Sequence, residues 1–234
     1  MLFSRLKLPR TAVNDRKLPE YTKSEELFNM ITHIIGGAFA LSILIVCCVF
    51  AALHNNVPGI ISGVVYGLSM ITVYVVSSVY HGLDAKRSHR GKRVMQIIDH
   101  CDIYGLIIGS FAPIALTGLR ERNPVLAWVS FGIVCAVSVI GIVFTSIDFT
   151  KYSVVSYSAY FLAGWSVLMT VRELHAAFSK EFIVLLITGG IVYTAGMIFF
   201  VLEQKKYRYC HTIFHLFILA GSVIHFIAIF KYCI

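Results

Sequence analysis

Histidine, serine and aspartate residues lie at the ends of three long apolar stretches, where a membrane-spanning sequence would ordinarily carry apolar side chains. Ser77 and His81 close the second stretch, Asp99 opens the third, and His211 and His215 open the last. Residues four apart share one face of a helix, so the members of each pair can reach a common point. Ionisable groups inside spans are costly to insert, and they therefore indicate a functional site.

Three imidazoles with a fourth position left for water are the ligand set of many catalytic zinc ions. We expect His81, His211 and His215 to bind zinc, and the H-x-x-x-H spacing of the last two occurs in other helical zinc sites. The ion would acidify a bound water and generate a nucleophile. Asp99 could hydrogen-bond that water or orient an imidazole. Asp102 shares a helix face with Asp99 and competes with it for this role.

The composition indicates an integral membrane protein. Hydrophobic residues make up 58% of the 234 residues and charged residues 14%, and the mean hydropathy is +0.79. A soluble domain could not cover so much apolar surface. The sequence predicts an all-α, seven-transmembrane helix bundle that forms a single domain over residues 1–234. Apolar runs of about 20 residues place the spans near 30–53, 57–81, 96–118, 124–146, 152–172, 181–203 and 210–231.

The basic residues indicate the orientation of the bundle. The connections between the expected spans are short, so neighbouring helices run antiparallel. Fifteen of the twenty Lys and Arg residues then fall on the side that carries the basic segment 1–26. This bias predicts a cytoplasmic N-terminus and an external C-terminus. It also accounts for the net charge of +8 through attraction to anionic lipid heads, so we expect no nucleic-acid partner.

Two other features of the sequence are simpler to interpret. The first 26 residues are polar and basic, so we expect no cleavable signal peptide. The six cysteines lie in or beside apolar runs without a C-x-x-C pair, which favours packing roles over a disulfide framework or a thiolate zinc site.

The alternating helix directions bring the polar residues to one depth, in the cytoplasmic half of the bundle. Glu26, Asn29 and His33 form a stripe at the same depth on the first span, at positions i, i+3 and i+7. This stripe could support the site or admit a substrate, or it could be a polar packing contact between helices. His225 lies 14 residues beyond His211, about 21 Å along the helix, and cannot share the site.

Four motifs occur in order at the expected helix ends. They are E-x-x-N-x-x-x-H-x-x-G from Glu26 to Gly36, S-x-x-x-H from Ser77 to His81, an aspartate (Asp99) ten residues before Gly109-Ser110-Phe111-Ala112-Pro113, and H-x-x-x-H from His211 to His215. With these motifs the chain resembles, over nearly its whole length, the haemolysin III family. That family is the bacterial branch of the progestin and adipoQ receptor superfamily, which includes the adiponectin receptors.

The resemblance implies seven helices, a cytoplasmic N-terminus and a zinc ion on His81, His211 and His215. It further implies that Asp99 contacts the zinc-bound water and that Ser77 assists at the site. In the adiponectin receptors such a site is associated with ceramide hydrolysis, whereas haemolysin III proteins are named for lysis of red cells. The short tails of this chain fit a protein of the bacterial cytoplasmic membrane rather than a hormone receptor.

We therefore expect a zinc-dependent hydrolase that cleaves an amide or ester bond in a membrane lipid, with Asp99 and Ser77 as catalytic residues. Two alternatives remain at this stage: a membrane-perturbing haemolysin, and a lipid-sensing regulator of membrane homeostasis in which zinc is structural. Membrane lipid is the expected substrate or ligand in each case, and no protein partner is predicted.

The charge bias makes a direct prediction about topology. A reporter fused after Ile234 should register outside the cytoplasm, and the same reporter fused before Met1 should register inside it, because Lys and Arg oppose translocation. Paired fusions of a periplasmic and a cytoplasmic reporter at each terminus measure this. The reverse pattern would move the histidines to the outer leaflet.

Overall fold

The computed structural model describes residues 10–203 and 207–234, which include seven long helical spans and no strand. Each is long and apolar enough to cross a membrane. Five of the spans are single helices: α1 (Lys23–Leu53), α2 (Val57–Gly82), α5 (Pro124–Asp148), α8 (Lys180–Glu203) and α9 (Cys210–Cys233). The fold class predicted from the sequence is therefore confirmed, and the chain is an integral membrane protein.

The third and fifth spans are interrupted. The third joins α3 (His89–Ile114), a π-helical segment (Ala115–Leu119) and α4 (Arg120–Arg122). The fifth joins α6 (Ser153–Trp165), a 3₁₀ segment (Ser166–Thr170) and α7 (Val171–Ala177). A proline inside a helix removes a backbone donor. Pro113 precedes the break in the third span, where Thr117 leaves helical geometry and its hydroxyl donates to the Pro113 carbonyl at 2.7 Å.

The observed spans match the expected ones, but α1 and α3 each begin seven residues earlier than hydropathy predicts. Thr22 and Glu25 form a capping box that starts α1 in polar sequence. At the opposite end of the bundle, Asn56 and Asn123 cap α2 and α5, and a proline follows each cap within two residues.

Four of the basic residues counted for orientation (Arg5, Lys7, Lys205 and Lys206) lie outside the described residues.

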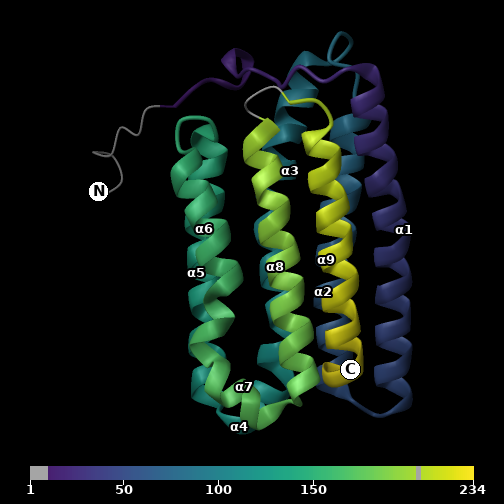
Figure 1. The fold of residues 1–234 in the computed structure, drawn as a ribbon, viewed down its shortest axis with the longest axis vertical. Coiled ribbons are helices and arrows are strands. Elements are labelled where there is room, and N and C mark those ends of the chain that lie inside the picture. Colours follow the sequence, from purple (N-terminus) through teal and green to yellow (C-terminus); the bar gives the residue numbers. More distant parts are fainter. Residues whose placement is uncertain (1–9, 204–206) are drawn as a thin grey trace.

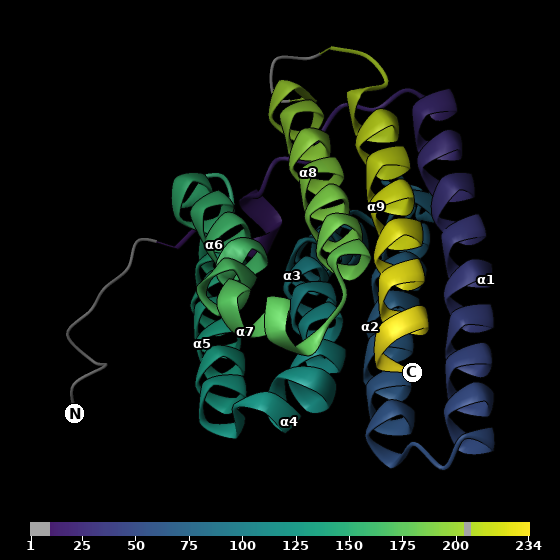
Figure 2. The same ribbon diagram turned by 60° about the horizontal axis from the view of Figure 1, so that its bottom comes forward.

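The bundle places five helix ends around one point. Helix α9 packs between α8 and α1, with α2 and α3 behind it, while α5 and α6 stand together on the far side (Figure 1). The start of α1, the end of α2, the starts of α3 and α9 and the end of α8 meet at one end of the bundle, called the histidine end below. Residues 10–22, the N-terminal strap, cross over this end before entering α1. The C-terminus lies at the opposite end (Figure 2).

Helices α1 and α2 approach closely because glycines lie between them. A methyl group added at Gly67 would come within 2.7 Å of the Leu44 Cβ and 2.8 Å of its Cα. Backbone atoms cannot move aside as a flexible side chain can. The close α1–α2 contact holds Glu26 and Asn29 of α1 beside the last turn of α2, so it positions the histidine end.

Replacing Gly67 with Ala should lower the free energy of unfolding by about 1–3 kcal/mol, because overpacking forces the two helices apart. Gly132→Ala is the matched control, since a methyl group there meets no atom within 4 Å. The control should be neutral or stabilising by up to about 1 kcal/mol, because Ala is the better helix former. Thermal unfolding in detergent measures both variants, and equal melting temperatures would contradict the packing argument.

Candidate metal centre

Three imidazoles converge at the histidine end. His81 lies in the last turn of α2, and His211 and His215 lie in the first two turns of α9. One ring nitrogen from each residue lies within 4.8 Å of the corresponding nitrogens of the other two. All three side chains are buried, with at most 4% exposed. The structure therefore brings together the three histidines that the sequence singled out.

The second nitrogen of each ring faces an oxygen acceptor. The Nδ1 of His81 lies 2.7 Å from the Glu26 carboxylate, and the Nδ1 of His211 lies 2.6 Å from the Glu203 carboxylate. The Nδ1 of His215 lies 3.2 Å from the backbone carbonyl of Asn29. Ionised carboxylates and carbonyls can only accept hydrogen bonds, so each Nδ1 carries the proton. Each Nε2 is then left with a free lone pair, the form that binds a metal.

The spacing of the free nitrogens fits one ion. The Nε2 atoms of His81 and His211 lie 3.2 Å apart. If both are unprotonated, they cannot hydrogen-bond to each other. Two nitrogens about 2.05 Å from one tetrahedral ion lie about 3.3 Å apart. The observed separation of 3.2 Å matches the separation expected for two ligands of one tetrahedral ion.

The charges around the imidazoles also favour a cation. Glu26 forms an ion pair with Lys92, whose Nζ lies 2.5 Å from Oε1 and whose side chain is almost fully buried. Glu26, Glu203 and Asp99 are acidic groups of this cluster, and Lys92 is a basic one. A buried excess of charge is costly. A bound cation would offset the negative charge that these carboxyl groups carry.

Asp99 and Ser77 lie beside the imidazoles. Both side chains are buried, and Asp99 neighbours Ser77 and interacts electrostatically with His211. The Ser77 hydroxyl has no hydrogen-bond partner within normal limits among the described residues. Asp102, the competitor to Asp99, is less buried and lies one turn further along α3. A carboxyl group and a hydroxyl next to the three imidazoles can hold a water or a polar substrate group.

The stripe on α1 packs against the centre along its whole length. Glu26 and Asn29 contact His81 and His215 as described, and the Asn29 side chain also accepts a hydrogen bond from Thr212. The His33 ring stacks on that of His215, with 3.5 Å between centroids and 14° between planes. Neither ring nitrogen of His33 has a hydrogen-bond partner among the described residues. The stripe therefore lies in contact with two of the three imidazoles, and a supporting role for it at the expected metal site stays a prediction.

Glu203, Lys92 and Tyr21 take part in the centre, although the sequence did not single them out. The Tyr21 hydroxyl donates to Glu203, and its ring centroid lies 5.7 Å from that of His81 and 5.3 Å from that of His211. Burial and the nearby Glu203 hold the pKa of the Tyr21 phenol well above its usual range, so the hydroxyl stays protonated. Glu203 could have been identified from the sequence by the alternation of helix directions, because this alternation places the end of α8 level with the start of α9.

The N-terminal strap fixes Tyr21 over the centre. The Arg16 guanidinium donates to the carbonyls of Ser146 and Ile147 at 2.6 and 2.5 Å, near the C-terminus of α5. Cations are favourable at this end of a helix. The strap thereby covers the histidine end from its water-facing side.

His225 lies far from the centre, and its Nε2 donates to the Leu186 carbonyl at 3.1 Å.

The fold and the site together define a seven-helix integral membrane protein with a buried three-histidine centre at one end. The chain belongs to the haemolysin III family, since the family model described as haemolysin-III related matches residues 21–226. It is 33% identical over 214 residues to the hemolysin-3 homolog of Bacillus subtilis, covering 92% of this chain and 97% of that protein. These relationships and the seven spans place it in a bacterial plasma membrane.

Two further relatives show how widely the sequence pattern extends. Hemolysin-3 of Bacillus cereus is 31% identical over 216 residues, which cover 92% of this chain and 94% of that protein. The human monocyte to macrophage differentiation factor is 27% identical over 238 residues, which cover 98% of this chain and 92% of that protein.

Replacing Glu203 with Gln should weaken zinc binding about 10–100-fold, because the His211 ring loses its charged acceptor. Competition with a chelator of known zinc affinity measures the constant. Glu121→Gln is the matched control, since Glu121 is exposed at the opposite end of the bundle and should bind zinc as the wild type does. Identical affinities in all three proteins would exclude an orienting role for Glu203.

Proposed function

We propose that this protein is a zinc-dependent hydrolase that cleaves an amide or ester bond in a membrane lipid. The observation that carries the proposal is the shared orientation of the three imidazoles, in which every Nδ1 faces an acceptor and every Nε2 remains free. An ion bound by His81, His211 and His215 would act as a Lewis acid and acidify a water in its remaining position. A purely structural site would fill that remaining position with a protein ligand.

The residues of the chain can carry the proton through the reaction. The oxygen of a water molecule bonds to the carbonyl carbon of the lipid, and Asp99 accepts the proton that the water loses. The bond from that carbon to nitrogen or oxygen then breaks. Asp99 returns the proton to the leaving amine or alcohol, so that a free fatty acid and the remainder of the lipid are released. The Ser77 hydroxyl, which lies beside Asp99, can donate to the carbonyl oxygen as negative charge develops there.

An apolar pocket beside the centre supports a lipid as the substrate. It has a volume of about 570 Å³ and lies between α3, α6, α8 and α9. Phe214 lines it, and the Phe214 ring centroid is 5.7 Å from that of His211. The lining residues Phe161 and Leu162 are more than half exposed on the outer surface of the bundle. The pocket therefore opens toward the hydrocarbon of the bilayer, where acyl chains are the available ligands.

A second candidate function comes from the name of one relative. The Bacillus cereus protein is called hemolysin-3, which favours a membrane-perturbing protein in which zinc has only a structural role. Such a protein would keep its lytic effect when Asp99 loses its charge, whereas a hydrolase would not keep its turnover. The same substitution therefore separates the two functions.

Replacing Asp99 with Asn should reduce hydrolysis by about 10²-fold or more, because the amide cannot accept the proton of the attacking water. Purified protein is incubated with a panel of fatty acyl amides and esters, and released fatty acid is followed by mass spectrometry. Asp102→Asn is the matched control and should keep its activity, since it changes the same chemical group one turn away.

Zinc content is measured on the same samples. Asp99→Asn should retain about one zinc per chain, and His211→Ala should lose it, because His211 supplies one of three ligands. The wild type could release no more fatty acid than a zinc-stripped sample with every member of the panel. That result would refute the hydrolase and favour the lytic protein. Equal zinc content in wild type and His211→Ala would refute the metal centre itself.

A further inference from the structure

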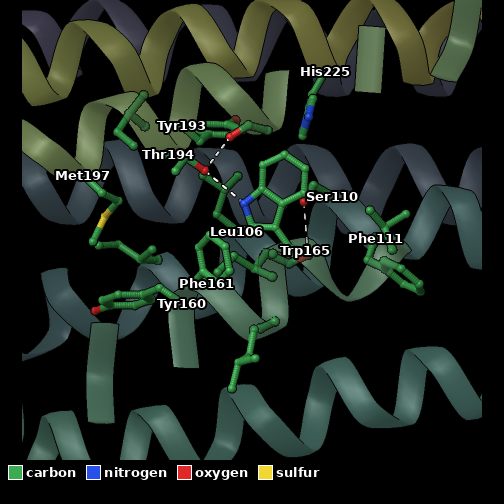
Figure 3. A pocket seen from close by; sticks show the side chains of 18 of the residues that line it. Leu106, Ser110, Phe111, Tyr160, Phe161, Trp165, Tyr193, Thr194, Met197 and His225 are labelled. Carbon is green, nitrogen blue, oxygen red and sulfur yellow. Dashed lines mark hydrogen bonds between the residues drawn. The ribbon is translucent and has the colours of Figure 1, made fainter. Parts of the chain in front are cut away.

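The side chain of Trp165 crosses the apolar pocket from one wall to the other. It projects from the end of α6, and its Nε1 donates to the Thr194 hydroxyl of α8 at 3.0 Å. Thr194 in turn donates to the Gly190 carbonyl at 2.8 Å, and a methyl group added at Gly190 would lie 3.4 Å from the indole. Figure 3 shows the indole among the lining side chains, with Thr194 beside it. The glycine leaves room for the ring, and the hydrogen bond holds it in this position.

The indole lies between two groups of pocket-lining residues. Met197, Tyr160 and Phe214 line the part toward the histidine end, whereas Leu186, Phe111 and His225 line the part beyond the indole. Figure 3 places Met197 and Tyr160 on one side of Trp165, and Phe111 and His225 on the other. A chain that enters from the metal centre therefore meets the indole before it reaches the far part.

The distance along α8 from the histidine end to the indole is close to the length of an acyl chain that spans one leaflet. Glu203, which contacts His211, lies nine residues from Thr194 and thirteen from Gly190 along α8. At 1.5 Å per residue these separations are about 14 and 20 Å. Half of a hydrocarbon core about 30 Å thick is about 15 Å. An acyl chain that spans one leaflet would thus end near Trp165 when its carbonyl lies at the imidazoles.

We infer that Trp165 sets the length of the acyl chain that the pocket accepts. The indole narrows the pocket where the chain would end, and its removal would widen the passage to the far part. This inference rests on the proposed function in taking an acyl lipid as the occupant. It adds a specificity-determining residue about one leaflet's depth from the proposed chemistry.

The position of the chain end can be measured by fluorescence quenching. The protein has two tryptophans, so Trp128→Phe leaves Trp165 as the single indole. Fatty acids that carry bromine on different carbons are added to this variant in nanodiscs, since bromine quenches an indole that it contacts. Quenching should be strongest with bromine near the methyl end and weakest near the carboxyl group. Quenching that does not depend on bromine position would overturn the inference.

Trp165→Phe provides the matched control for quenching. It retains Trp128, which is 53% exposed on the outer surface of α5 and reports fatty acid dissolved in the bilayer. At low fatty acid concentration the Trp165 protein should be quenched more than this control. Equal quenching in the two proteins would show that Trp165 contacts only bulk lipid and would also overturn the inference.

Chain length is tested by competition. Nanodisc-embedded protein is equilibrated with an equimolar mixture of saturated fatty acids, from lauric to arachidic, and bound acids are quantified by mass spectrometry relative to empty nanodiscs. Trp165→Ala should shift the preferred acid to a longer chain. The ratio of long to short bound acids should rise about fourfold or more, because burying one additional methylene contributes about 0.8 kcal/mol. Trp165→Phe should shift it less, and Trp128→Ala should match wild type.

The outcomes separate this inference from the proposed function. The same chain-length profile in wild type, Trp165→Phe and Trp165→Ala would overturn the inference even if the protein hydrolyses lipids. A shifted profile without any fatty acid release from the substrate panel would support Trp165 as the chain stop and refute the hydrolase. Because Trp165→Phe keeps an aromatic ring in place, it tests the inference even if Trp165→Ala does not fold.

Discussion

The histidine end depends on one physical constraint: each of its three converging imidazoles needs an acceptor for the ring nitrogen that carries the proton, because a buried donor without a partner is costly. Glu26, Glu203 and the Asn29 carbonyl each satisfy one nitrogen of a histidine, and the other nitrogens turn toward a shared point. The acceptors come from α1 and α8, whereas the imidazoles come from α2 and α9. Four helices must therefore pack in one register before the centre exists.

The same constraint explains the close packing of the surrounding helices. Glu26 can reach His81 only because α1 lies tightly against α2, and glycines such as Gly67 allow that approach. Lys92 extends the arrangement to α3, because it bonds to Glu26 and to the Leu83 carbonyl at the end of α2. A small displacement of any of these helices would leave a charge without its partner, which is costly in a medium of low dielectric constant.

Much of this arrangement could be predicted from the sequence. Length and hydropathy identify the spans, and helix alternation places His81, Asp99 and His211 at one depth. Glu203 ends the span predicted at 181–203, but no polar residue three or four positions before it marks that helix face as part of a site. Tyr21 gives no periodic signal, since it lies in the strap outside the long helices. The pocket depends on how α6 packs against α8, and no residue type or spacing specifies that packing.

The order of the ligands along the chain has a consequence for biogenesis. His81 enters the bilayer with the second helix, whereas His211 and His215 arrive with the last one. Because chains are synthesised from the N-terminus, the imidazoles cannot meet until α9 has been made. Until then, Glu26 and His81 have each other as partners, and His81 keeps one ring nitrogen free. Assembly of the centre therefore waits for all seven spans.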